Sequence, residues 1–293
     1  MFVLRKLLLA FLLLASFASF SLLAQTVTAQ TLPQLYISNE PGKSLQLLNL
    51  NNSVLTTIFN VGGTGELDDL TLNAAGQLIY SIPSLGEVDL YDPVAKTNKV
   101  LVSGLKWARD LEIEPGGQTM LIAIYSPGSI VRFNFASGTA TTLAKKLGTC
   151  DGITYDPYGN LYAVANHNTI VQINPTTGAI IKTLTLEPHA GVNGGDGLTY
   201  DSYTESLWAT HDGTTGYKLL QIPVAAAGLP NSFSSFDLPA GITSPDGIKS
   251  DGKGNLYVGA IHTAFVYNIA TNTVTQNITV KGADGVSLVP GTY

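Results

Sequence analysis

The stretch DGITYDPYGNLYAVANHNTIVQINPTTG, residues 151–178, decides the fold of this chain of 293 residues. It begins with Asp-Gly, continues as a short apolar run, turns at Tyr158-Gly159-Asn160, and returns through a second run that ends in Asn-His. A third run and another turn follow. Short runs rich in Ile, Val, Tyr and Thr, separated by Gly, Asn and Pro, are typical of antiparallel β-hairpins. We therefore expect consecutive β-strands here.

Similar stretches occur at five other places in the chain. Each starts with an aspartate before a short apolar run, at Asp69, Asp110, Asp196, Asp246 and Asp284. The six starting aspartates, counted with that of the first stretch, are separated by 41, 41, 45, 50 and 38 residues. This is the repeat length of one four-stranded propeller blade. Outside the first residues the apolar pattern has no helical period, so the sequence predicts an all-β, six-bladed β-propeller.

The last repeat supplies only one strand, Gly285 to Val289, so its blade needs strands from elsewhere. Three strand-like runs precede the first repeat, at Gln34 to Ser38, Leu45 to Leu50 and Val54 to Phe59. We expect these N-terminal strands to pair with the C-terminal strand. Such pairing closes the ring and removes the open sheet edges that an unclosed array would present.

The first residues are typical of a secretory signal peptide. Arg5 and Lys6 precede an apolar run from Leu7 to Ala24, and Val27-Thr28-Ala29 is a small-residue cleavage pattern. We predict a signal peptide over residues 1–29 and a single propeller domain over residues 30–293. Cleavage after Ala24 and an uncleaved anchor are the alternatives. The predicted location is secreted, either extracellular or periplasmic, with no membrane attachment after cleavage.

Charge and cysteine content limit the partners and the bonds of the mature chain. Removal of the two basic residues of the signal changes the formal net charge from −6 to −8, which argues against nucleic acid and anionic membranes as partners. The single cysteine, Cys150, allows no intrachain disulfide. We expect a monomer whose partner is a small molecule in the central channel.

Polar residues are predicted to gather at one mouth of that channel. In each blade the innermost strand starts at the repeat aspartate, and the second strand returns antiparallel to it. The end of the second strand therefore lies on the same face as the aspartates. His167, His211 and His262 stand at such ends, and His189 lies in the connection before Asp196.

The repeat aspartates have two interpretations. Each carboxylate can accept backbone N–H bonds from a neighbouring inner strand and tie blades together, which we favour most for Asp69 and Asp110, where Leu replaces the following Gly. Alternatively, carboxylates that converge on one axis repel each other, and either become protonated or hold a cation. Ca²⁺, and after it Mg²⁺, fits an extracellular carboxylate site.

Two residues directly before repeat aspartates also allow two interpretations. Cys150 has no basic neighbour in sequence to activate it, so a buried filler is favoured over a nucleophile. Arg109 either pairs with Asp68 or Asp110 or holds an anionic group of a substrate at the channel mouth.

The repeats DGITYDPYGNLYAVAN and PDGIKSDGKGNLYVGA resemble those of NHL-repeat proteins and of the senescence-marker-protein/gluconolactonase-like family. These are six-bladed propellers that include divalent-metal lactonases. The resemblance implies a metal held in the channel, with Asp246 of Pro245-Asp246-Gly247 as the ligand that matches the family motif best. Glu40 is a loose match to the early glutamate of the family, whereas Asp151 and Asp196 stand where the family tends to have asparagine.

Two hypotheses follow from these residues. In the first, a secreted metal-dependent hydrolase opens a small cyclic ester, with Ca²⁺ bound by Asp246 and by Asp151, Asp196 or Glu40. Asp246 or His211 would then take the proton from the attacking water. A lyase of the streptogramin-linearising type is a related possibility. In the second hypothesis, the propeller is a non-catalytic module that binds a ligand or partner on the channel face.

Overall fold

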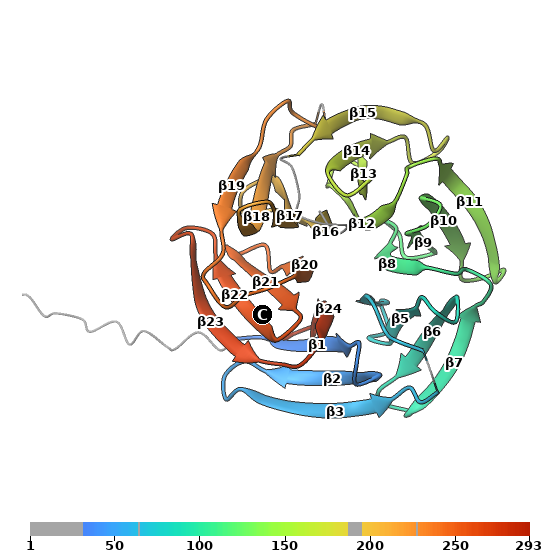
Figure 1. Cartoon of the computed structure of the whole chain (residues 1–293). Helices are drawn as coiled ribbons and strands as arrows, with labels where there is room; N and C mark the ends of the chain where they lie inside the picture. The colour runs from blue at the N-terminus through green and yellow to red at the C-terminus, as the bar shows by residue number, and fades with distance from the viewer. Residues whose placement is uncertain (1–31, 64, 187–194, 227) are drawn as a thin grey trace, which may run out of the picture. The chain divides into compact units, whose positions relative to one another are not determined.

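Six β-sheets surround a central channel in the computed structural model, which describes residues 32–63, 65–186, 195–226 and 228–293 (Figure 1). Each sheet has four antiparallel strands, and the described residues contain no helix. Within that part of the chain there is accordingly no helical segment able to span a membrane. The predicted all-β, six-bladed propeller is confirmed, whereas the predicted signal peptide lies outside the described residues.

The blades are numbered from the first complete one. Blade 1 holds β4 (Leu70–Leu72), β5 (Leu78–Ile82), β6 (Glu87–Asp92) and β7 (Thr97–Val102). Blade 2 holds β8 (Ala108–Ile113), β9 (Thr119–Ile124), β10 (Ser129–Asn134) and β11 (Thr139–Lys145). Blade 3 holds β12 (Cys150–Tyr155), β13 (Leu161–Ala165), β14 (Thr169–Ile173) and β15 (Ile180–Thr185).

The other three blades complete the ring. Blade 4 holds β16 (Gly195–Asp201), β17 (Ser206–Gly213), β18 (Gly216–Pro223) and β19 (Ser234–Asp237). Blade 5 holds β20 (Pro245–Ser250), β21 (Asn255–Ala260), β22 (Thr263–Asn268) and β23 (Thr273–Thr279). Blade 6 holds β24 (Ala283–Leu288), β1 (Gln34–Asn39), β2 (Ser44–Asn49) and β3 (Val54–Asn60).

Both ends of the propeller meet in blade 6, as the sequence predicts. The sheet order is β24-β1-β2-β3, and β1 pairs antiparallel with β24 through Leu35 opposite Leu288 and Ile37 opposite Val286. The observed strands match the predicted ones to within a residue or two at their ends. This pairing leaves no inner edge of the ring open.

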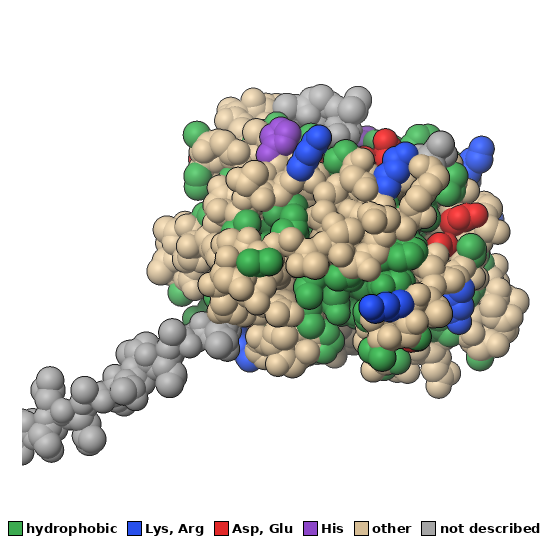
Figure 2. Space-filling view, turned by 90° about the horizontal axis from the view of Figure 1, so that it is seen from below, with side chains coloured by type: hydrophobic (Ala, Val, Ile, Leu, Met, Phe, Trp, Pro, Cys, Tyr) green, Lys and Arg blue, Asp and Glu red, His purple; other side chains and the backbone are tan. Residues whose placement is uncertain are grey.

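The core lies between adjacent blades. One cluster joins Leu121 and Ile130 of blade 2 to Ile153 and Leu161 of blade 3. Sheets covered on both faces explain why a second strand such as β13 is apolar and buried along its whole length instead of alternating. The outer strands are exposed instead, and charged side chains on the wall of the ring are few and scattered (Figure 2).

Glycines after four of the repeat aspartates let the inner strands approach closely. A Cβ added at Gly152 of β12 would stand 2.5 Å from both the Asp196 carbonyl oxygen and the Leu198 nitrogen of β16. Gly247 of β20 would likewise meet the Asp284 carbonyl oxygen at 2.7 Å. The Asp-Gly pairs of the sequence are therefore explained first by packing around the channel.

We predict that Gly152→Ala destabilises the protein, because the new methyl group meets the backbone of β16 and this neighbouring inner strand must move. Overpacking of this kind costs about 1–3 kcal/mol, which a urea unfolding curve measures as a lower midpoint at unchanged slope. An unchanged midpoint would show that β12 and β16 part without cost and would contradict this packing role.

Candidate functional site at the channel mouth

The pairing register corrects the alignment of the repeats. In blade 2 Leu111 lies opposite Ile122, and in blade 3 Ile153 lies opposite Ala163, each directly after a β-bulge. Leu111 therefore corresponds to Ile153, and the residue equivalent to Asp151 is Arg109, not Asp110. The sequence comparison was wrong by one position in blades 1 and 2, because it aligned aspartates and not the buried residue that follows them.

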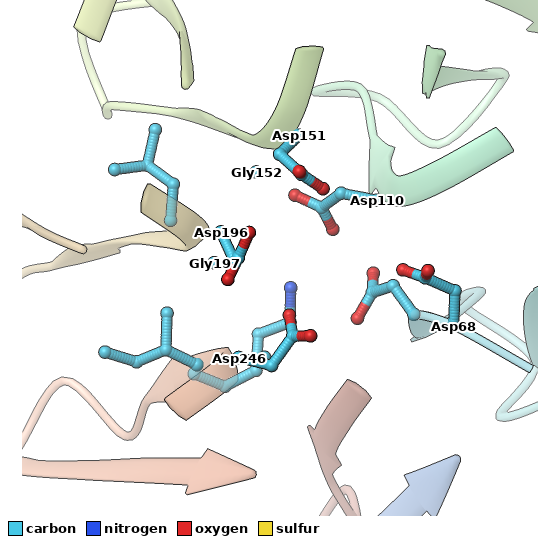
Figure 3. A pocket seen from close by; sticks show the side chains of 12 residues that line it. Asp68, Asp110, Asp151, Gly152, Asp196, Gly197 and Asp246 are labelled. Carbon is cyan, nitrogen blue, oxygen red and sulfur yellow. The ribbon is translucent and has the colours of Figure 1, made fainter. Parts of the chain in front are cut away.

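The corrected register defines two rings of residues. The equivalent positions nearest the aspartate face form the acidic ring: Asp68, Arg109, Asp151, Asp196, Asp246 and Asp284. The next positions form the middle ring: Asp69, Asp110, Gly152, Gly197, Gly247 and Gly285. Side chains from both rings converge on one central space (Figure 3). A bulge in an inner strand re-aims a side chain in this way.

Asp69 and Asp110 of the middle ring tie neighbouring blades together. The Leu111 N–H of blade 2 donates to Asp69 of blade 1 at 3.1 Å, and the Ile153 N–H of blade 3 donates to Asp110 of blade 2. The two carboxyl groups also hydrogen-bond each other, which raises the pKa of Asp69 after the larger effects of its burial and the Asp110 charge. This is the scaffold role that the sequence favours for these two residues.

The central space is small. Six carboxyl groups, from Asp68, Asp69, Asp110, Asp151, Asp196 and Asp246, line a cavity of about 10 Å³ together with other residues of β12, β16 and β20. Such a volume holds about one water molecule. Small molecules therefore reach the carboxylates from the mouth and do not enter between them.

Burial raises the pKa values of the acidic ring. It raises the pKa of Asp68 to about 7, although the Arg109 charge lowers it. Burial likewise raises the pKa values of Asp151 and Asp196 well above the usual range, and neighbouring carboxylates raise them further. Burial, followed by the charge of Asp246, also raises the pKa of Asp284, and these two side chains share a hydrogen bond. Burial and mutual repulsion thus favour the protonated form of these carboxyl groups over the ionised form.

Arg109 is the one cation of the acidic ring. Its Nη1 lies 3.1 Å from Asp68 Oδ2, and its guanidinium carbon lies 4.8 Å from the centre of the Tyr125 ring. The charge of Asp68 raises the pKa of Arg109, burial lowers it, and the charges of other ring carboxylates raise it further. Its buried Nε has no hydrogen-bond partner among the described residues. The guanidinium is thus held between the ring carboxylates and the Tyr125 ring.

A wider pocket of about 190 Å³ opens at the mouth above the acidic ring. Its polar lining comes from Glu40, Arg109, Ser244, Asp246 and Asp284. Glu40 follows β1, the second strand of blade 6, and lines this pocket together with Asp246. Burial, followed by the charges of Glu66 and Asp246, raises the Glu40 pKa. The pocket combines carboxyl groups with one guanidinium.

The other predicted residues lie at different depths around this mouth. Asp151, Asp196 and Asp246 share the central cavity. His211, in contrast, is completely buried on β17 opposite Gly195. Cys150 is also buried, and burial raises its thiol pKa, which fits the filler interpretation.

Of the other histidines, His189 lies outside the described residues, whereas His167 packs edge-on against Tyr125 with ring centres 5.6 Å apart.

Three further polar residues of the channel region were missed from the sequence. Asp212 follows His211 near the mouth, and burial followed by the charge of Asp246 raises its pKa to about 7. Lys249 and Glu112 lie deeper, on inner strands. The sequence could have indicated Lys249 and Glu112, because a charged residue is rare on a buried inner strand.

The donor chemistry of the mouth suits Ca²⁺, because carboxylate oxygens are its usual ligands. However, no three or more of the His, Cys, Asp and Glu side chains in the described ranges stand in an arrangement that would hold a metal ion. The residues thus do not present a preformed metal centre. Calcium binding by Glu40, Asp151, Asp196 and Asp246 stays a prediction.

Elemental analysis of the purified mature protein tests that prediction. If Ca²⁺ binds at the mouth, the wild type carries about one equivalent and Asp246→Asn loses it, since one of its charged ligands becomes neutral. Asp237→Asn is the matched control, because Asp237 lies on the outer strand β19 with 82 % of its side chain exposed. A wild type without bound metal after dialysis against Ca²⁺ would contradict the prediction.

Comparisons with known proteins identify the fold and not a family. No protein-family model matches the chain, and no curated protein is similar to it in sequence. Among solved structures, the chain is similar to one from a nidogen/laminin complex, with 15% identity and a TM-score of 0.71 over 87% of this chain and 98% of that one.

Two enzymes are among the other similar structures. Hydrazine synthase of Kuenenia stuttgartiensis has 14% identity and a TM-score of 0.64 over 85% of this chain and 84% of that one. Virginiamycin B lyase of Staphylococcus aureus has 16% identity and a TM-score of 0.62 over 86% of this chain and 84% of that one. At such identities the likeness establishes the propeller fold alone.

Proposed function

We propose that this protein is a secreted enzyme that opens a small cyclic ester at the channel mouth by acid–base chemistry. One observation carries the proposal: carboxyl groups with raised pKa values share a pocket of about 190 Å³ with a guanidinium. A carboxyl group that changes protonation near neutral pH can serve as a general base or acid. Secretion rests on the predicted signal peptide.

The hydrogen-bonded pair Asp246 and Asp284 is suited to move the protons of hydrolysis. Water adds to the ester carbonyl, and the ionised member of the pair takes the proton that the water loses. The ring C–O bond then breaks, and the protonated member gives its proton to the departing alkoxide. The Arg109 guanidinium, which lines the same pocket, stabilises the oxyanion between these steps. His211 stays a predicted alternative base, on a buried strand.

The same carboxyl pair also suits an elimination that opens the ring without water. This variant is favoured by the similarity to streptogramin-cleaving lyases, one of which was solved as a catalytically inactive histidine-to-alanine variant with quinupristin. The product mass separates the two reactions. Hydrolysis adds the mass of one water to the substrate, whereas elimination leaves the mass unchanged.

A panel of lactones and cyclic esters, followed by mass spectrometry, tests the proposal on the mature protein. We expect turnover of at least one substrate and a loss of about 100-fold or more in kcat/KM for Asp284→Asn, because general acid–base catalysis contributes about 10²–10⁴-fold. Asp237→Asn on β19 is the control and keeps the wild-type rate. Equal rates for the wild type and Asp284→Asn would contradict the role of the pair.

A non-catalytic binding propeller is the second candidate. The observation that favours it is the scaffold role of Asp69 and Asp110, whose carboxylates hold backbone N–H groups of the next blade. If the mouth only holds a ligand, no member of the ester panel is converted. Unchanged stability of Asp246→Ala in the same protein would then favour a ligand held at the mouth without chemistry.

A further inference from the structure

A second pocket opens at the opposite mouth of the channel. Three residues beyond each member of the acidic ring, the inner strands carry a third ring, the far ring: Thr71, Glu112, Thr154, Thr199, Lys249 and Ser287. Five of these six residues, all but Thr154, line a cavity of about 340 Å³. Inner strands run through the channel from one mouth to the other, so this pocket faces away from the acidic ring.

Lys249 separates the far pocket from the acidic ring. It lines both the small central cavity and the far pocket. Burial lowers the Lys249 pKa, but the charges of Asp69, Asp110 and Glu112 outweigh this effect and raise it. The ammonium group is therefore charged at neutral pH and held by carboxylates. The two mouths are separate sites, and the far one has Lys249 and Glu112 in its floor.

Three hydroxyl groups of the far pocket are available to a ligand. Thr199 and Ser287 are more than nine-tenths buried, with 7% and 8% of their surfaces exposed, and both line the cavity with Thr71. None of these hydroxyls has a hydrogen bond to another residue of the described chain. Because they line an open cavity, these hydroxyls can each donate to and accept from water or a polar ligand. They come from blades 1, 4 and 6 and surround the pocket.

The rim of the far pocket is apolar and aromatic. Leu72, Leu288 and Pro290 line it, and Tyr293, of which 49% is exposed, completes the wall. The Lys253 ammonium lies 5.9 Å from the centre of the Tyr293 ring and favours one position of that ring. One aromatic face beside several hydrogen-bonding groups is an arrangement that suits a ring with an apolar face and polar edges.

We propose that the far pocket binds a neutral sugar of monosaccharide size. The hydroxyls of Thr71, Thr199 and Ser287 hydrogen-bond the sugar hydroxyls, while Lys249 donates and Glu112 accepts at the floor. Tyr293 covers the apolar face of the sugar ring. A volume of 340 Å³ lies near the lower end of the range of about 300–1,000 Å³ for ligand pockets, which fits one sugar unit.

The charged groups at the floor of the far pocket favour a neutral sugar over a charged ligand. Three carboxylates, from Asp69, Asp110 and Glu112, surround the single ammonium of Lys249. Asp69 and Asp110 hydrogen-bond each other, and burial raises the pKa of Glu112 to about 7, so the floor carries little net charge. Lys249 is already held by these groups, which leaves an anionic sugar acid no free counter-ion. A cationic amine would be repelled by Lys249 at the floor, which stands between it and the deeper carboxylates.

Titration of the mature protein with D-glucose, D-galactose, D-mannose, glucuronate and glucosamine, followed by calorimetry or saturation-transfer NMR, tests the proposal. We expect at least one neutral sugar to bind. We expect Thr199→Val and Ser287→Ala each to weaken that sugar about tenfold, as loss of one ligand hydrogen bond does. Both replacements retain the side-chain volume closely enough to keep the fold, which thermal unfolding checks.

Ser244→Ala is the matched control, because this serine lines the pocket at the opposite mouth and its loss leaves sugar affinity unchanged. Three results would each overturn the proposal. The wild type binds none of the neutral sugars at tens of millimolar, or only glucuronate or glucosamine binds, or the Thr199 and Ser287 variants bind as tightly as the wild type. None of these results bears on ester opening at the acidic mouth.

Discussion

Replacement of Arg109 by methionine is expected to destabilise the propeller by about 3–5 kcal/mol, the usual cost of removing one partner from a buried ion pair. Arg109 is the one cation among five aspartates of the acidic ring and lies 3.1 Å from Asp68. Without it, Asp68 must either remain charged without a partner or take up a proton. Urea unfolding at pH 8 measures the effect, since most carboxylates of the chain are ionised there.

Lys145→Met is the control for this variant. Lys145 stands at the exposed end of the outer strand β11, where a surface charge contributes about 0–1 kcal/mol. Methionine also retains the apolar stem of either cation. If Arg109→Met and Lys145→Met destabilise the protein equally, the guanidinium does not compensate the ring, and the electrostatic account of the channel is wrong.

The second large effect concerns pH, and we expect the protein to become more stable as the pH falls from 8 to 5. Burial raises the folded-state pKa of Asp68 to about 7 from an ordinary value of 3.8, and those of Asp151 and Asp196 well above 3.8. The folded state therefore binds more protons than the unfolded chain in this range. Stability is present in full below the unfolded pKa and is lost as the pH rises through the folded pKa.

The slope of this dependence is large. Each additional proton bound by the folded state changes the free energy of unfolding by about 1.4 kcal/mol per pH unit. Carboxyl groups with lowered pKa values act in the opposite direction. Burial raises the pKa of Glu114, but hydrogen bonds from Arg132 and Tyr155 outweigh it, and backbone hydrogen bonds from Ala95 lower that of Asp92. Their effect begins only below about pH 4.5.

Thermal unfolding from pH 8 to pH 5 in buffers of equal ionic strength measures the trend. Asp68→Asn removes one titrating group, so the rise in melting temperature on acidification becomes smaller in this variant. Asp237→Asn keeps the wild-type slope, since its carboxylate is exposed. A melting temperature that falls steadily between pH 8 and pH 5 would show that the ring carboxylates are ionised in the folded protein.

The fold was predictable from the sequence because its signal repeats. Short strands, Gly and Asn turns and a period near that of one blade fix the number of blades, and a last repeat that is cut short after Asp284 predicts the closure. The site was predictable only in outline. Asp151, Asp196 and Asp246 converge as expected, since equivalent positions of inner strands meet at the channel.

What the sequence could not supply was the register within the repeats. In Asp68-Asp69 and in Arg109-Asp110, either of two adjacent polar residues could be aligned with Asp151 of blade 3. Only the bulge, with Leu111 opposite Ile122, decides which side chain belongs to the acidic ring. The partners of Lys249 were equally hidden, because they come from blades 1 and 2 and are brought together by ring closure.

The pairing of β1 with β24 sets the order of events when the chain folds. Within blades 1 to 5 consecutive strands are neighbours, so each hairpin closes a short loop and forms early. In blade 6, Leu35 pairs with Leu288, which lies 253 residues further along the chain. Closing so long a loop costs conformational entropy before the contact contributes any stabilisation. We expect the pairing of β1 with β24 to form last, so that a partly folded chain is an open arc of blades with the unpaired strands β1 and β24 exposed at its ends.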